Sequence, residues 1–214
     1  YAYLKGLSLD AENGISSFTS DSVRFEFKNI DIENSSSASA GGTISILSAD
    51  TYLGASASGS VYEGIIENCN ITNSTVDGQN HDVPNISGAP NAGVLVGLNR
   101  LGTLNIKNVN LKTTKEEPDF VFAVNVASTG VGYSGYPVII DNFNVDGYTY
   151  KASTTGAQIS GVVSTILSNL EIKNSSFTNL TFDTISNTAG IVNYASGNVI
   201  ADKIKIQNFD MKNK

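Results

Sequence analysis

The sequence is short of the residues that most often carry catalysis, metal binding and covalent cross-linking. Its 214 residues include one Cys, one His, one Met, two Arg and no Trp. A single cysteine excludes an intrachain disulfide, and a single histidine excludes a metal site built on several histidines. Charged residues are 15% of the chain, against about a quarter in a typical soluble domain. The polar character comes instead from 24 Asn, from Ser and Thr, and from 20 Gly.

The chain also has little positive charge and no long apolar run. It has 13 Lys and Arg against 20 Asp and Glu, which gives a net charge of −7. Such a surface repels phosphate backbones and anionic lipids, so we expect no nucleic-acid partner and no electrostatic membrane docking. The longest apolar runs, such as residues 94–96 and 138–140, are far shorter than the ~20 residues that span a bilayer, so we expect no membrane insertion.

What the sequence contains instead is one ten-residue pattern that recurs along its length. FEFKNIDIEN begins at Phe25, LNIKNVNLKT at Leu104 and LEIKNSSFTN at Leu170. We take the fifth residue of each copy as its anchor. Successive anchors are 23, 39, 40, 34, 32 and 34 residues apart, and they are Gly6, Asn29, Asn68, Asn108, Asn142, Asn174 and Asn208. A fixed pattern at variable spacing indicates a stacked repeat fold with loops of different length.

Each copy reads as two short strands that meet at the anchor. The residues two before and three after every anchor are apolar, and the residues one before and two after are polar. Apolar and polar residues therefore alternate with a period of two, and the alternation changes phase at the anchor. Asn and Gly adopt positive φ more readily than other residues, so a corner is expected there. Asn side chains in register can also hydrogen-bond between layers, which predicts a structural ladder along this corner.

Further apolar blocks lie before most copies and supply a third strand for each repeat. Examples are residues 44–47, 94–96 and 159–163. Three short strands per repeat around an apolar interior predict an all-β parallel β-helix, or β-solenoid, of about seven turns with an Asn ladder at one corner. We expect a single domain over residues 1–214. Both chain ends fall within a copy of the pattern, so we expect a fragment of a longer protein with further repeats at both ends.

One segment carries a family motif. The run AGVLVGLN at residues 92–99, followed by Gly102, Leu104, Ile106 and Asn108, resembles the GLUG-type repeat of bacterial surface proteins. That repeat occurs in adhesins and in the large immunoglobulin-A-cleaving metallopeptidases of streptococci, and it implies a secreted or cell-surface bacterial protein. The row of Asn anchors is also similar to the Asn ladder of pectate-lyase-like β-helices, which implies a right-handed helix. Neither resemblance carries a catalytic residue over to this chain.

The resemblance to pectate-lyase-like proteins raises the question of an enzyme, because that class includes polysaccharide lyases and hydrolases. Its hydrolases use clustered Asp with Gly-His-Gly and Arg-x-Lys, none of which occurs in this chain. His-Glu-x-x-His and Gly-x-Ser-x-Gly are also missing. His81 lies in a Gly/Asn/Pro-rich loop, and Cys69 follows an anchor where most other copies carry larger apolar residues. We therefore expect a solvated His81, a buried Cys69, no catalytic residue, no metal and no cofactor.

Two groups of residues remain as candidates for contact with a ligand. Tyr133 and Tyr136 lie in the Gly-rich segment STGVGYSGYP, where exposed tyrosines could stack on a sugar or fill a pocket of a partner protein. Glu116, Glu117 and Asp119 form an acidic cluster in TTKEEPD that could bind Ca²⁺ or act as paired carboxylates. Local packing of the tyrosines and solvation of the acidic cluster are the structural alternatives.

Two other tyrosines have an interior interpretation. Tyr148 and Tyr150 lie six and eight residues after their anchor, and Leu180 and Phe182 occupy the same offsets one repeat later. This match predicts that both tyrosines stack inside the fold and do not form a binding site.

The pattern as a whole favours a non-catalytic segment that acts as an adhesin passenger or stalk and presents loops to host glycans or proteins. The expected contact regions are the longest insertions between copies: residues 35–60, 77–91 and 113–120, together with the tyrosine segment 129–137. The alternative is a carbohydrate-active β-helix enzyme that uses the carboxylates of Glu116, Glu117, Asp119 and Asp141. A third interpretation is an accessory region of a large surface peptidase.

Overall fold

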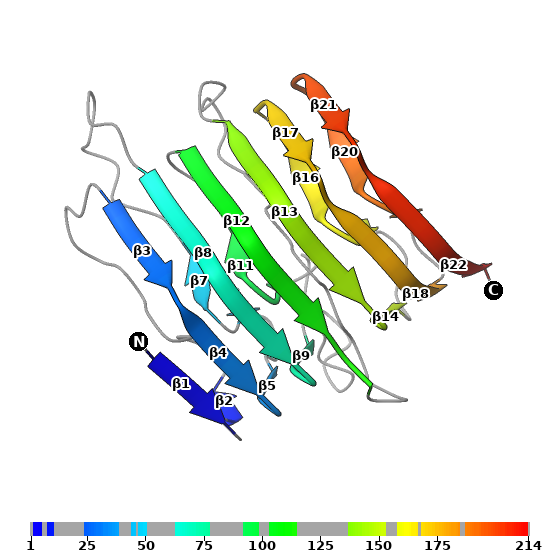
Figure 1. The fold of residues 1–214 in the computed structure, drawn as a ribbon. Coiled ribbons are helices and arrows are strands. Elements are labelled where there is room, and N and C mark those ends of the chain that lie inside the picture. The colour runs from blue at the N-terminus through cyan, green and yellow to red at the C-terminus, as the bar shows by residue number, and fades with distance from the viewer. Residues whose placement is uncertain are drawn as a thin grey trace, which may run out of the picture.

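The computed structural model describes a chain built from parallel strands. The described residues are 2–5, 8–10, 24–38, 44–45, 47–50, 63–77, 92–98, 103–114, 137–152, 158–166, 168–184 and 187–213. Every regular element within these ranges is a β-strand, which confirms the all-β prediction for the described part of the chain. Figure 1 shows the strands of the largest sheet lying side by side with their arrowheads pointing the same way.

The largest sheet has 11 strands, and we call it the main sheet. Its central path runs β1, β4, β8, β12, β13, β17, β21, and every pairing in it is parallel. Strands along this path therefore follow chain order, as expected for a stacked repeat. The members are β1 (Ala2–Lys5), β3 (Arg24–Lys28), β4 (Ile30–Glu33), β8 (Glu63–Thr72), β12 (Thr103–Lys112), β13 (Val138–Asp146), β14 (Thr149–Ala152), β17 (Leu170–Lys173), β18 (Ser176–Thr184), β21 (Val199–Asp202) and β22 (Lys205–Asn213).

Smaller parallel sheets lie beside the main sheet. One has three strands: β2 (Ser8–Asp10), β5 (Ser36–Ala38) and β9 (Thr75–Asp77). The others are two-stranded and pair a segment of one repeat with the equivalent segment of a later repeat: β6 (Ile44–Ser45) with β10 (Ala92–Gly93), β7 (Ser48–Asp50) with β11 (Val96–Leu98), β15 (Gln158–Ser160) with β19 (Asn187–Ala189), and β16 (Val163–Ile166) with β20 (Val192–Ala195). These segments include apolar blocks predicted as further strands, and the arrangement is consistent with a β-solenoid.

Each repeat bends at a first corner, which lies at the Asn that the sequence predicted. Asn29, Asn68, Asn108 and Asn142 have φ of 57°, 55°, 54° and 54°. In β8 the buried positions change phase across this residue, since Gly64 and Ile66 are buried before it and Cys69 and Ile71 after it. One residue in the left-handed conformation therefore turns the strand while keeping apolar side chains inward on both sides.

A second corner follows five residues later. It is formed by residues with positive φ, namely Asn34, Asn73, Gly147, Asn179 and Asn208. Gly147, at φ 82°, is the one glycine among them, and a Cβ there would lie 2.3 Å from the carbonyl oxygen of Thr113. The conformation and the close approach of the neighbouring backbone together explain glycine at this position.

For the first and last copies, the register predicted from the sequence is wrong by five residues. Leu4 of β1 pairs with Ile32, at the second corner, whereas the sequence aligned it with Phe27. Gly6 itself lies outside the described residues. Asn208 continues the second corner after Asn179, and Lys203, with φ 53°, takes the first-corner position after Asn174. The cause is that both corners carry an apolar residue, a polar residue and then Asn, so a five-residue shift preserves the pattern.

The core is a continuous stack of inward-pointing side chains. Within it, Tyr150 stacks on Phe182 with ring centroids 4.6 Å apart and planes 7° apart. Tyr148 is fully buried, donates its hydroxyl hydrogen to the carbonyl oxygen of Ser74 at 3.0 Å, and has its pKa raised by burial. The interior placement predicted for both tyrosines is therefore confirmed.

Candidate functional site

The outer surface of the main sheet carries a row of charges that alternates in sign from strand to strand. Lys28 is in register with Glu67, and Glu67 with Lys107. The alternation continues across β13, β17 and β21. We call this set the charge row: Lys28, Glu67, Lys107, Asp141, Lys173 and Asp202. Because neighbouring strands lie about 4.8 Å apart, each inner member has an opposite charge on both sides.

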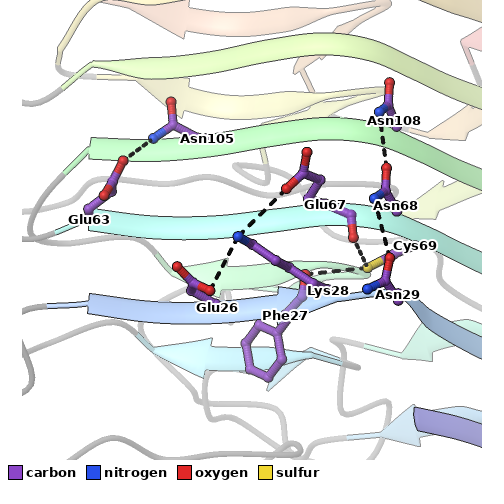
Figure 2. A network of polar contacts seen from close by, with 10 residues as sticks. All are labelled: Glu26, Phe27, Lys28, Asn29, Glu63, Glu67, Asn68, Cys69, Asn105 and Asn108. Carbon is purple, nitrogen blue, oxygen red and sulfur yellow. Dashed lines mark hydrogen bonds and ion pairs between the residues drawn. The ribbon is translucent and has the colours of Figure 1, made fainter. Parts of the chain in front are cut away.

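Ion pairs are formed by two lysines of the charge row, and one of these pairs joins neighbouring members. The Nζ atom of Lys28 lies 3.7 Å from the Glu67 carboxylate and 3.2 Å from that of Glu26, as Figure 2 shows. Lys173 forms an ion pair with Glu171, whose hydrogen bond and charge raise the Lys173 pKa. Asp202 and Asp141 add smaller effects in the same direction. These neighbours therefore favour the charged form of Lys173.

A ladder of side-chain amides runs along the first corner. The Nδ2 of Asn68 donates to the Oδ1 of Asn29 at 3.3 Å, Asn108 donates to Asn68 at 3.0 Å, and Asn142 donates to Asn108 at 3.0 Å. Part of this column is visible in Figure 2. The ladder changes at Asn174, whose amide donates to Asp141 at 2.8 Å. We call the four residues from Asn29 to Asn142 the corner ladder.

A second amide ladder, which the sequence analysis missed, runs parallel to the first. Asn70 donates to Asp31 at 2.8 Å, Asn110 to Asn70 at 2.9 Å, and Asn144 to Asn110 at 3.0 Å. The Ser176 hydroxyl then donates to the Oδ1 of Asn144 at 2.6 Å. We call this the outer ladder. Its positions, two after each anchor, were recognised as polar, and their run of Asn was the signal that could have revealed it.

The corner ladder leads to a prediction about Asn108. Replacing Asn108 with Leu should destabilise the fold by about 1–3 kcal/mol, because Leu is strained at φ 54° and loses both ladder hydrogen bonds. Replacing it with Gly should cost about 0.5–1.5 kcal/mol, since Gly keeps the conformation and loses only the hydrogen bonds. Urea unfolding of the parent chain and of the Leu and Gly variants measures both losses of stability. A Leu variant as stable as the parent would contradict the structural role of this corner.

The residues predicted to contact a ligand lie outside the described part of the chain. These are Tyr133, Tyr136, Glu116, Glu117 and Asp119, and His81 lies outside it as well. Their roles remain predictions.

Asp141 is the one carboxylate of the enzymatic alternative that the structure describes. It accepts the Asn174 amide and stands between Lys107 and Lys173 in the charge row. The contacts described for Asp141 therefore link neighbouring strands of the main sheet.

Cys69 is buried, as predicted. Its Sγ donates to the carbonyl oxygens of Glu67 at 3.3 Å and Phe27 at 3.6 Å, which Figure 2 shows. Burial raises the pKa of the thiol, so the reactive thiolate is disfavoured. Elsewhere in the described ranges, no group of three or more His, Cys, Asp or Glu side chains is placed to hold a metal ion.

Comparison with known proteins does not extend this picture. No protein-family model matches the chain, and searches of the curated proteins and of the solved structures found no significant match. In the described residues, no helix has the length and apolar character needed to cross a membrane.

Proposed function

We propose that the chain is a right-handed parallel β-helix of about seven turns that serves as a non-catalytic segment of a bacterial secreted or cell-surface protein. It acts as an adhesin passenger or stalk and presents loops to a host glycan or protein. The GLUG-type resemblance of residues 92–108 supports the surface location. The scaffold role is supported by the way in which the strands are held together.

The observation that carries the proposal is the repetition of the same contacts from strand to strand. The corner ladder, the outer ladder and the charge row link residues on neighbouring strands that are 29 to 40 positions apart in the sequence. Ladder bonds form between fixed positions of each repeat, so the segments between repeats can differ in length without changing the stack. A scaffold of this kind suits the presentation of variable loops, with the candidate contact residues Tyr133 and Tyr136 on one of them.

A binding screen of the purified full chain tests this proposal. The chain is expected to bind a defined host glycan or extracellular protein on an array, and the double variant Tyr133→Ala/Tyr136→Ala is expected to lose at least about tenfold in affinity. Tyr194→Ala is the matched control, because Tyr194 is an exposed tyrosine on β20, outside the proposed contact regions. Equal binding by both variants would contradict the assigned contact residues.

A depolymerisation screen on polysaccharides separates binding from catalysis. The proposal expects no turnover. Turnover that disappears in Glu117→Ala with an unchanged melting temperature would replace it with the carbohydrate-active enzyme.

A further inference from the structure

The outer surface of the main sheet repeats over two strands. A second row runs beside the charge row, two residues earlier on each strand, and isoleucine occupies every other position in it. Ile65 and Ile139 point outward and are only half-buried, and Asn105 lies between them in register. We call this set the isoleucine row: Glu26, Ile65, Asn105, Ile139, Glu171 and Ile200.

The isoleucine row and the charge row change together from strand to strand. β8 carries Ile65 and then Glu67, whereas the next strand, β12, carries Asn105 and then Lys107. β13 repeats the first arrangement with Ile139 and an acidic residue, and β17 repeats the second with a polar residue and a lysine. All four strands are paired on both sides, so the exposure of these side chains is not an effect of the chain ends.

Ion pairing within the sheet explains only one of the two rows. Alternation of charge is expected there, because opposite charges on neighbouring strands attract. The same contacts leave the outward isoleucines without an apolar neighbour in register. Ile65 stands between Glu26 and Asn105, and Ile139 stands between Asn105 and Glu171. A surface that covers both rows must therefore offer opposite charges and apolar contacts with the same two-strand repeat.

A row of alternating charges is complementary to its own reverse. β12 and β13 lie side by side in the middle of the sheet (Figure 1). A two-fold axis parallel to the strands and midway between these two brings the outer surfaces of two copies face to face and reverses the order of the strands. Lys107 of each copy then faces Asp141 of the other, and Glu67 faces Lys173. This axis overlaps all six strands that carry the rows, whereas an axis one strand away overlaps only four.

The same two-fold axis interleaves the isoleucine rows. Ile139 falls opposite Asn105 of the other copy and Ile65 falls opposite Glu171, so each isoleucine enters the gap between two isoleucines of the facing row. Side chains of packed sheets interdigitate in this way, with the sheets about 10 Å apart. A two-fold axis along the stacking direction instead sets like charges together or buries carboxylates against isoleucine. The axis parallel to the strands is therefore the one that satisfies both rows.

We propose that this outer surface docks the same surface of a second copy of the chain, around a two-fold axis between β12 and β13. The strands of the two copies run parallel and their stacks run in opposite directions. The interface is isologous, so the assembly closes as a dimer. Its six strands and five residues per strand make a face of roughly 25 Å by 15 Å, which is the size of a weak interface. We therefore expect dimers at micromolar concentrations and above.

Two charge variants of the full chain test this arrangement by sedimentation velocity. Lys107→Glu places a carboxylate opposite Asp141 of the second copy at both symmetry-related positions, and Asp141→Lys places a cation opposite Lys107 in the same way. Each variant alone is expected to associate at least about tenfold more weakly than the parent chain. An equimolar mixture is expected to recover the affinity of the parent, because each variant then meets the opposite charge on the other.

The mixture distinguishes docking between copies from ion pairing within the sheet. Each variant disturbs its own sheet whether it is alone or mixed, so mixing cannot rescue an effect within the sheet. Lys112→Glu and Asp146→Lys are the matched controls, because these residues form an ion pair on the same two strands beyond the first corner, outside the docked face. Both controls are expected to associate like the parent. Circular dichroism checks that every variant remains folded.

Ile139→Ser tests the isoleucine row without changing any charge. It is expected to weaken self-association about tenfold, because Ile139 then no longer fills the gap in the facing row. Unchanged association of this variant would overturn the role of the isoleucine row. A parent chain that stays monomeric at every concentration would overturn the dimer. A mixture no stronger than its separate components would overturn the two-fold arrangement, and equal weakening by the control variants would overturn the assignment of this face.

Discussion

Replacing Ile140 with Asp is expected to unfold the chain or to reduce its stability by about 3–5 kcal/mol. Ile140 is fully buried in β13, in register with Ile106 on one side and Ile172 on the other. A carboxylate there would lose its hydration without gaining a cation or a hydrogen-bond donor. Because a domain is stable by only about 5–15 kcal/mol, the loss is a large part of the total. Thermal unfolding followed by circular dichroism measures it.

The neighbouring residue provides a matched control for this variant. Ile139 lies on the same strand, points to the outer surface, and is in register with Asn105 and Glu171. Ile139→Asp is expected to cost no more than about 1 kcal/mol, because the new carboxylate remains in water. An equal loss of stability at both positions would contradict the assignment of one face to the core.

The interior of the fold was predictable because it follows from local alternation. Each strand has one face in the core and one in water, so Gly64 and Ile66 before the corner, and Cys69 and Ile71 after it, show burial with a period of two. The corner was predictable for the same reason. The change of phase and the Asn both follow from one residue in the left-handed conformation. Neither inference requires knowledge of which strands are neighbours.

The register of the first and last copies was not predictable from local pattern. Leu4 and Asn208 fit the pattern at either corner, because the two corners of one strand share the same order of apolar, polar and Asn residues. Only pairing distinguishes the alternatives, as in Leu4 with Ile32 and Leu180 with Phe209. Pairing is a non-local property, and a five-residue shift leaves the local pattern intact.

The charge row was missed for a related reason. Lys28, Glu67 and Lys107 were each recognised as polar, yet alternation of sign has meaning only when these residues are known to be in register. They lie 39 and 40 residues apart, with loops of different length between them. The charge row can therefore be recognised only when the register of the strands is known. Tyr133, Tyr136 and the acidic cluster lie outside the described residues, and their roles remain predictions from residue type.

Replacing Gly147 with Ala is expected to destabilise the chain by about 2–5 kcal/mol. Two effects add at this residue. Its φ of 82° is strained for a residue with a side chain, and the new Cβ would lie 2.3 Å from the carbonyl oxygen of Thr113. That oxygen belongs to the backbone of the neighbouring strand path, so the contact cannot be relieved by a side-chain rotation. Equilibrium unfolding in urea measures the loss.

Asn34→Ala separates the two effects, because Asn34 occupies the same corner with φ 53° and is exposed. Alanine there carries the conformational strain alone and is expected to cost about 1–2 kcal/mol. The excess loss at Gly147 therefore reports the close approach of the two backbones. If both variants lose the same stability, the strands do not approach as closely as the structure has them, and glycine stands at this corner for its conformation only.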